Sequence, residues 1–77
     1  GIDFEYSKGS KGLVSGCTLF NNFGYGIRCR PNTEISNCYF CENEVEAVQV
    51  LRKSTDISKQ QILSSVLQSG NVFIENG

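Results

Sequence analysis

The sequence predicts an all-β fold in which short strands wind into about three stacked parallel coils, a solenoid. The first observation is an internal repeat that aligns residues 13–22 with residues 34–43 at a constant offset of 21 residues. The second is that each copy alternates apolar and polar residues over short segments separated by Gly, Asn or Pro-Asn turns. The third is that the first two copies show no helical period. Short strands repeated at about this period are typical of solenoids, because each coil completes the hydrogen bonds of its neighbour.

The composition is that of one small folded domain. The 77 residues are 39% hydrophobic and only 19% charged, with five Phe and three Tyr to bury, so intrinsic disorder is excluded. A net charge of −1 excludes nucleic acid or membrane binding through bulk charge. Since the sequence has no His, catalysis by Ser-His-Asp or Cys-His groups and His-ligated metal sites are also excluded.

The elements follow from the repeat, and we expect one partial domain with coils at residues 1–25, 26–46 and 47–77. In the first coil a strand at residues 1–4 precedes a Gly/Ser/Lys loop that holds four extra residues. Residues 26–29 and 47–50 repeat this first strand. In the third coil residues 55–58 echo residues 33–36, and the repeat resumes at residues 71–76.

The insertion between these two segments predicts a short helix near residues 58–69. Ile62, Leu63, Val66 and Leu67 recur at helical spacing, and Gly70 is expected to end the helix. The helix is expected to cover the side or the open end of the stack. The alternative is that it docks on another chain.

Stacking at the observed offset predicts which residues lie in each inward column, because alternate side chains of a strand point to the same face. The expected columns are Ile2, Ile27 and Val48; Phe4, Cys29 and Val50; Val14, Ile35 and Ile57; Cys17 and Cys38; Leu19, Phe40 and Phe73; and Asn22, Asn43 and Asn76.

Four motifs link the chain to a known family. They are the strand starts Gly-Ile-Asp-Phe and Gly-Ile-Arg-Cys and the two Cys-x-(Leu/Phe)-x-x-Asn segments at residues 17–22 and 38–43. With them the chain resembles right-handed parallel β-helix proteins, the fold of pectate-lyase-like enzymes and bacteriophage tailspikes. The resemblance implies that Asn22, Asn43 and Asn76 form an asparagine ladder with a structural role, beside the stacked Cys17 and Cys38.

The resemblance also implies a saccharide groove on the outward face of the first strand. Asp3 is expected to stack on Arg28 and Gln49, and Glu5 on Arg30. Asp3 and Glu5 would then be a catalytic acid and base pair acting on a glycosidic bond, and Arg28, Arg30 and Gln49 would bind substrate. The alternative is that the carboxylates and guanidinium groups form cross-strand salt bridges.

Aromatic rings are further candidates for sugar contacts. Tyr25 and Tyr39 are expected to contact substrate, and Tyr6, Phe20 and Phe23 also fall in turns or on outward positions. The alternative is local packing over the coil.

The four cysteines favour reduced thiols. Only Cys38 and Cys41 have the spacing of a metal knuckle, so no metal site is expected, and no cofactor either. Cys17, Cys29 and Cys38 fall in inward columns, whereas Cys41 is expected to be the most exposed. Buried thiols favour folding in a reducing cytoplasm.

Function follows from the resemblance. We expect a segment of a polysaccharide-binding or polysaccharide-degrading protein, a hydrolase or lyase if catalytic. The resemblance implies a phage tailspike or tail appendage that acts on host surface glycans and is located in the virion tail. Its expected partners are polysaccharide, the remainder of a longer β-helix chain and two further copies in a homotrimer, with no nucleic acid and no membrane. One alternative is a structural stalk or cap segment that mediates oligomer assembly. The other is a secreted polysaccharide lyase or epimerase.

Overall fold

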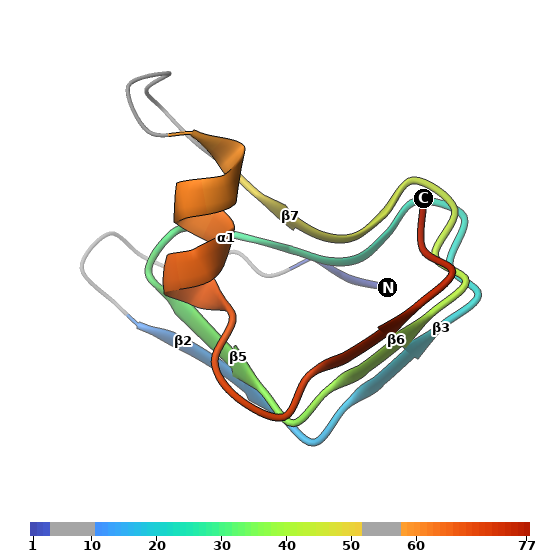
Figure 1. The fold of residues 1–77 in the computed structure, drawn as a ribbon, viewed down its shortest axis with the longest axis horizontal. Helices are drawn as coiled ribbons and strands as arrows, with labels where there is room; N and C mark the ends of the chain where they lie inside the picture. Colours follow the sequence, from blue (N-terminus) through green and yellow to red (C-terminus); the bar gives the residue numbers. More distant parts are fainter. Residues whose placement is uncertain (4–10, 52–57) are drawn as a thin grey trace.

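The computed structural model describes residues 1–3, 11–51 and 58–77, which form three small sheets and one short helix (Figure 1). Every strand pairs in parallel with its neighbours, so the all-β prediction is confirmed at this level. Sheet A contains β1 (Ile2–Asp3), β4 (Tyr25–Cys29) and β7 (Glu46–Val50); sheet B contains β2 (Gly12–Ser15) and β5 (Thr33–Ser36); sheet C contains β3 (Thr18–Phe20), β6 (Tyr39–Cys41) and β8 (Val72–Ile74). The helix is α1 (Lys59–Val66).

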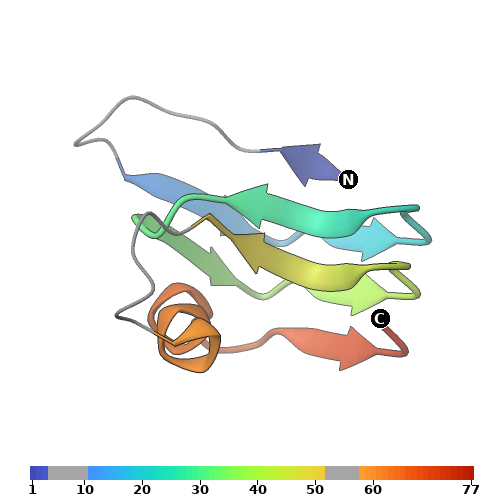
Figure 2. The same ribbon diagram turned by 90° about the horizontal axis from the view of Figure 1, so that it is seen from above.

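Consecutive strands belong to different sheets. The chain runs from β1 in sheet A through β2 in sheet B to β3 in sheet C, and β4 then returns to sheet A beside β1. Figure 1 shows the three sheets as the sides of an open triangle, and Figure 2 shows from above how the returning strands lie side by side. Each passage through the three sheets is one turn of the chain.

The predicted strand register is confirmed wherever the structure describes it. Aligned inward residues are Ile2, Ile27 and Val48; Cys29 and Val50; Val14 and Ile35; and Leu19, Phe40 and Phe73. Most of these side chains form the buried core. The rings of Phe40 and Phe73 stack with centroids 4.9 Å apart and planes within 5° of parallel. Phe4 and Ile57, which we placed in two of the columns, lie outside the described residues.

The asparagines of the sixth column are joined by side-chain hydrogen bonds. Asn22 Nδ2 donates to Asn43 Oδ1 at 2.7 Å, and Asn43 Nδ2 donates to Asn76 Oδ1 at the same distance. Asn43 Nδ2 also donates to the Leu19 carbonyl oxygen at 3.0 Å, and Asn76 Nδ2 to that of Phe40 at 3.1 Å. The amides of Asn43 and Asn76 therefore each bind a backbone carbonyl of the preceding turn.

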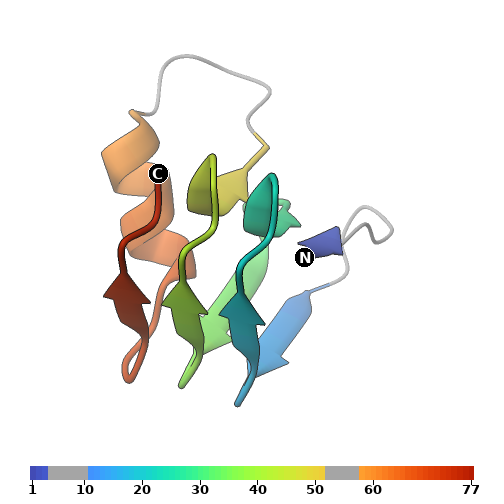
Figure 3. The ribbon, with the colours of Figure 1, turned by 90° about the vertical axis from the view of Figure 1, so that its right-hand side faces the viewer.

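Two corners of each turn use a residue in the left-handed region. Gly16, Asn37 and Gly70 have φ of 69°, 51° and 81° at the corner between sheets B and C. Asn21, Glu42 and Glu75 have φ of 58°, 54° and 52° at the corner that follows sheet C. The same backbone bend therefore recurs in every turn, as the aligned corners in Figure 3 show.

Small residues occupy one stacked position at the start of sheet A. A Cβ atom added to Gly26 would lie 2.6 Å from the carbonyl oxygen of Ala47 and 3.0 Å from Phe40 Cδ1. A Cβ atom added to Gly1 would similarly lie 2.9 Å from the Gly26 carbonyl oxygen. Glycine is therefore required where another turn of the chain packs directly against this position.

The helix predicted in the third turn is present and covers the core beside sheet B. Ser58 caps its N-terminus in a capping box with Gln61, which explains why it begins at Lys59. Ile62 and Val66 are buried, so the apolar stripe packs inside the chain.

The end of the helix differs from prediction. The helix ends at Val66 and not at Gly70, because Leu67 is extended (φ −81°, ψ 116°) and bridges to Ile35 in parallel. Gln68 N donates to the Ile35 carbonyl oxygen at 2.8 Å, which continues this pairing. Leu67 therefore lies next to Ile35, whereas Ile57, which we placed in that column, lies outside the described residues.

Candidate functional site on the outer face of sheet A

A row of polar side chains crosses the outer face of sheet A. Asp3 aligns with Arg28 and Arg28 with Gln49, in the predicted register. Asp3 and Arg28 are exposed and Gln49 is half-buried. Because neighbouring parallel strands lie about 4.8 Å apart, the three side chains form a regularly spaced row along the stack.

The charged members of this row remain accessible to a ligand. Within residues 1–3, 11–51 and 58–77, neither Asp3 nor Arg28 takes part in an ion pair. The cross-strand salt bridge offered as the alternative interpretation is thus not formed between these two residues.

Tyr25 joins the row through Gln49. The Nε2 atom of Gln49 donates a hydrogen bond to the Tyr25 hydroxyl at 3.1 Å, and both side chains are half-buried. The bond fixes the orientation of a phenol and an amide beside Arg28, which gives the face donors, acceptors and one aromatic ring.

Beyond Gln49 the row leads to a crevice between β7 and α1. Its volume is about 110 Å³, and it is lined by Glu46, Gln49, Val50, Lys59, Ile62 and Leu63. Lys59 forms an ion pair with Glu46 across the crevice. Sequence reasoning missed this feature, because the approach of Lys59 to Glu46 depends on how the helix packs.

The other predicted site residues are not gathered at this face. Glu5 lies outside the described residues, so the structure does not place the expected catalytic pair. Arg30 follows β4 and is half-buried. Tyr39 lies on sheet C, aligned with Thr18 and Val72, and not beside Tyr25.

The outer face of sheet C is apolar. Phe20, Tyr39, Val72 and Ile74 are all between 38% and 56% exposed there. Cys41 aligns with Phe20 and Ile74 and is only 7% exposed, so the prediction that it is the most exposed thiol was wrong. Partial desolvation, together with Cys41 and Glu42, raises the pKa of the Tyr39 phenol, which is therefore neutral at physiological pH.

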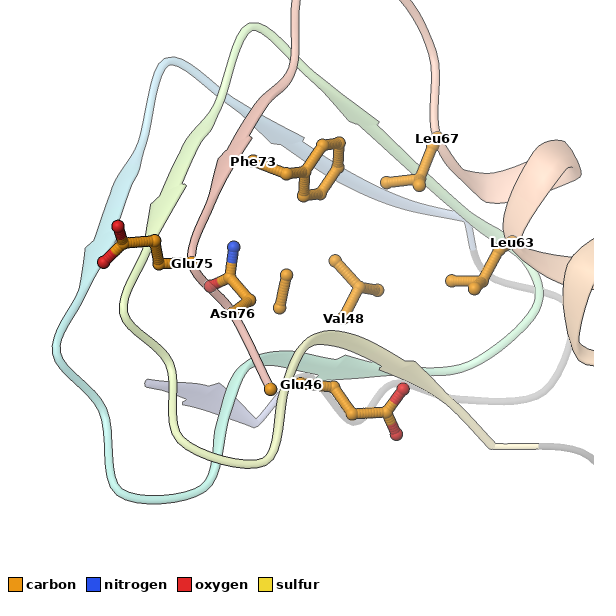
Figure 4. Close-up of a pocket in the computed structure, with 9 residues that line it drawn as sticks. Glu46, Val48, Leu63, Leu67, Phe73, Glu75 and Asn76 are labelled. Carbon is orange, nitrogen blue, oxygen red and sulfur yellow. The ribbon is translucent and has the colours of Figure 1, made fainter.

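A hollow of about 430 Å³ opens at the end of the stack that carries the C-terminus. Val48, Leu63, Leu67 and Phe73 point into it, while the carboxylates of Glu46 and Glu75 point away (Figure 4). These apolar side chains are the last members of the inward columns. The hollow is lined by these apolar groups and by the Asn76 amide.

The cysteines are buried or half-buried thiols, and no disulfide joins any of the four. Burial raises the pKa of Cys29, against an opposing hydrogen bond from Thr33, so this thiol is held neutral. In the part of the chain that the structure describes, no group of three or more His, Cys, Asp or Glu side chains is arranged to hold a metal ion. Asn71 continues the column of Cys17 and Cys38, and its Oδ1 accepts a hydrogen bond from Cys38 N at 3.0 Å.

Comparison with known proteins identifies no relative. No family model, no curated protein and no solved structure matches the chain. Over the described ranges, no helix is both long enough and apolar enough to cross a membrane.

Proposed function

We propose that the chain is part of a right-handed parallel β-helix that binds polysaccharide through the outer face of sheet A. The β-helix is supported by parallel pairing in all three sheets and by the return of the chain to each sheet in a constant register. Binding is supported by one observation above all, the exposed row of Asp3, Arg28 and Gln49 with Tyr25 held beside it.

Such a row suits a saccharide for chemical reasons. Sugar hydroxyls both donate and accept hydrogen bonds, and the row offers a carboxylate, a guanidinium and an amide in sequence. The Tyr25 ring adds an apolar surface for the face of a sugar. A repeating ligand fits a repeating surface, because each turn of the chain presents its side chains at the same height on the sheet.

The family resemblance alone supports three further parts of the proposal. The parent protein is a phage tailspike or tail appendage that acts on host surface glycans, it is located in the virion, and it is a homotrimer. Asp3 is the one member of the expected catalytic pair that lies within the described residues. Binding needs only the described row, so binding is proposed ahead of hydrolase or lyase activity.

Binding would be tested by screening the chain against bacterial surface polysaccharides and measuring affinity by calorimetry. Arg28→Ala is expected to weaken binding about tenfold, the loss of one charge-assisted hydrogen bond. Lys11→Ala is the matched control, because Lys11 carries the same charge next to sheet B, where it pairs with Glu34 at 2.6 Å. Equal effects of the two substitutions, or no effect of Arg28→Ala and Gln49→Ala, would contradict the proposal.

The second candidate is a structural segment that assembles with further copies. It is favoured by the exposed apolar outer face of sheet C, since such faces mark interaction surfaces. The helix is a poorer candidate for docking, because Ile62 and Val66 are already buried within the chain. Sedimentation of Val72→Thr and Phe20→Ser variants would show whether sheet C holds copies together.

A further inference from the structure

Cys17 and Cys38 lie directly across from one another in adjacent turns of the chain. They follow the left-handed residues Gly16 and Asn37 at the same corner. The Tyr39 amide donates to the Cys17 carbonyl oxygen at 2.8 Å, which fixes the register of the two strands at this point. The thiols are also oriented alike, since Cys17 Sγ lies 3.6 Å from the Ser15 carbonyl oxygen and Cys38 Sγ lies 3.2 Å from that of Ser36.

We propose that Cys17 and Cys38 are a redox-sensitive pair that forms a disulfide between the first and second turns when the chain meets an oxidant such as glutathione disulfide. Strands at this spacing put opposed Cα atoms about 4.8 Å apart, within the range of about 4.4–6.8 Å found for disulfides. Neither Cys29 nor Cys41 has a cysteine at the aligned position of the described neighbouring strands, because Cys29 aligns with Val50 and Cys41 with Phe20 and Ile74.

Access to the pair is through Cys17. This residue is half-buried and lines a hollow of about 460 Å³ together with Thr18, Leu19 and Phe20. Cys38, at 1% exposure, is less accessible than Cys17. Cys17 is therefore the attacking thiol and Cys38 the resolving thiol.

The exchange proceeds in two balanced steps. The Cys17 thiolate attacks one sulfur of glutathione disulfide, which breaks the S–S bond, releases one reduced glutathione and leaves a mixed disulfide on Cys17. The Cys38 thiolate then attacks the Cys17 sulfur and displaces the second reduced glutathione. The two protein thiols are oxidised, the glutathione disulfide is reduced, and the two thiol protons end on the two glutathione molecules.

The second step depends on pH. Burial raises the pKa of Cys38, with smaller and partly opposing effects from Cys17 and the backbone, so its thiolate is scarce near neutral pH. Among the described residues, the groups that face the Cys38 thiol are the Cys17 side chain, the Gly16 backbone and the carbonyl oxygens of Val14 and Ser36. Ring closure is therefore expected to accelerate as the pH rises, with the mixed disulfide on Cys17 accumulating at lower pH.

The test is to treat the folded chain with glutathione disulfide, block remaining thiols by alkylation and map the products by mass spectrometry. The expected product is a single disulfide between residues 17 and 38. Cys17→Ala should lose it, whereas Cys29→Ala and Cys41→Ala, the matched controls, should keep it. The same treatment in denaturant should give mixed pairings, which shows that the fold selects the pair.

Three results would overturn the proposal. The first is a native disulfide that maps to any other pair. The second is a mixed disulfide on Cys17 that does not close even at high pH. The third is four thiols that resist glutathione disulfide in the native state. Since Cys17 is only half-buried, Cys17→Ala should remain folded, which circular dichroism would verify.

Discussion

The side-chain amide of Asn43 donates hydrogen bonds to Asn76 Oδ1 at 2.7 Å and to the Leu19 carbonyl oxygen at 3.0 Å. Its oxygen accepts from Asn22 Nδ2 at 2.7 Å. Asn43 is fully buried, so this one side chain joins three turns of the chain away from water. Of its three partners, the Leu19 carbonyl oxygen is buried, and the Asn22 and Asn76 side chains are half-buried.

Replacing Asn43 should therefore cost more stability than replacing its neighbour in the ladder. Asn43→Ala is expected to lower the free energy of unfolding by about 3 kcal/mol, because three side-chain hydrogen bonds are lost and the buried Leu19 carbonyl oxygen loses this partner. Asn22→Ala, at the half-buried end of the ladder, should cost less. Urea denaturation of both variants would measure the difference, and equal losses would show that burial of the ladder is not the source of its stability.

Gly26 and Gly24 offer a matched pair of glycines. Gly26→Ala should lower the free energy of unfolding by about 1–3 kcal/mol, since its Cβ would meet the Ala47 carbonyl oxygen and the Phe40 ring. A Cβ at Gly24 would meet nothing within 4 Å, so Gly24→Ala is expected to be neutral or stabilising. Thermal unfolding would compare the two variants, and a Gly26→Ala variant as stable as the unsubstituted chain would contradict the close packing of the turns.

Glu42 and Glu44 differ in backbone conformation although both are exposed. Glu42 has a φ of 54°, a region that glycine adopts without steric cost, so Glu42→Gly should stabilise the chain by about 0.5–1 kcal/mol. Glu44 has no positive φ, and Glu44→Gly should destabilise it by a similar amount through the greater entropy of the unfolded chain. Chemical denaturation would measure the change in the free energy of unfolding for both variants, which is expected to be an increase for Glu42→Gly and a decrease for Glu44→Gly. Destabilisation of equal size in the two variants would argue against the left-handed corner.

The buried thiol of Cys29 predicts a loss of stability at high pH. Burial raises its pKa in the folded chain above the ordinary value of 9.0. Below that pH the thiol is protonated in both states, so its contribution to stability is fully present. As the pH rises further, the unfolded chain ionises first, and the contribution is lost as the pH approaches and passes the folded pKa. Denaturation at a series of pH values should show this decline in the unsubstituted chain and a shallower decline in Cys29→Val. Superimposable curves of stability against pH would show that ionisation of Cys29 does not cause the decline.

The strand register could be predicted from the sequence because one constant offset fixes every pair at once. Once Cys17 is aligned with Cys38, the pairs Ile27 with Val48 and Leu19 with Phe40 follow without further information. The polar row of Asp3, Arg28 and Gln49 follows from the same offset.

The predictions of the helix end and of the Cys41 exposure were wrong, because both depend on contacts between segments that the repeat does not encode. The end of α1 is set by the pairing of Leu67 with Ile35, which overrides the local signal of Gly70. Cys41 is covered because the large side chains of Phe20 and Ile74 lie on either side of it. The alternation of inward and outward residues predicts the direction of the Cys41 side chain but not how much its neighbours cover it. The crevice at Lys59 likewise has no signal in strand periodicity, because it depends on how the helix packs against β7.

The stacked position occupied by Gly1, Gly26 and Ala47 also bears on association between molecules. Unpaired strand edges are templates on which other chains can add strands and aggregate. If a further strand joined β7 in the register that β7 itself adopts on β4, its carbonyl oxygen would come as close to the Ala47 methyl group as 2.6 Å, the separation that excludes a side chain at Gly26. A further strand, whether from this chain or another, would therefore have to shift away from the Ala47 methyl group in order to pair with β7.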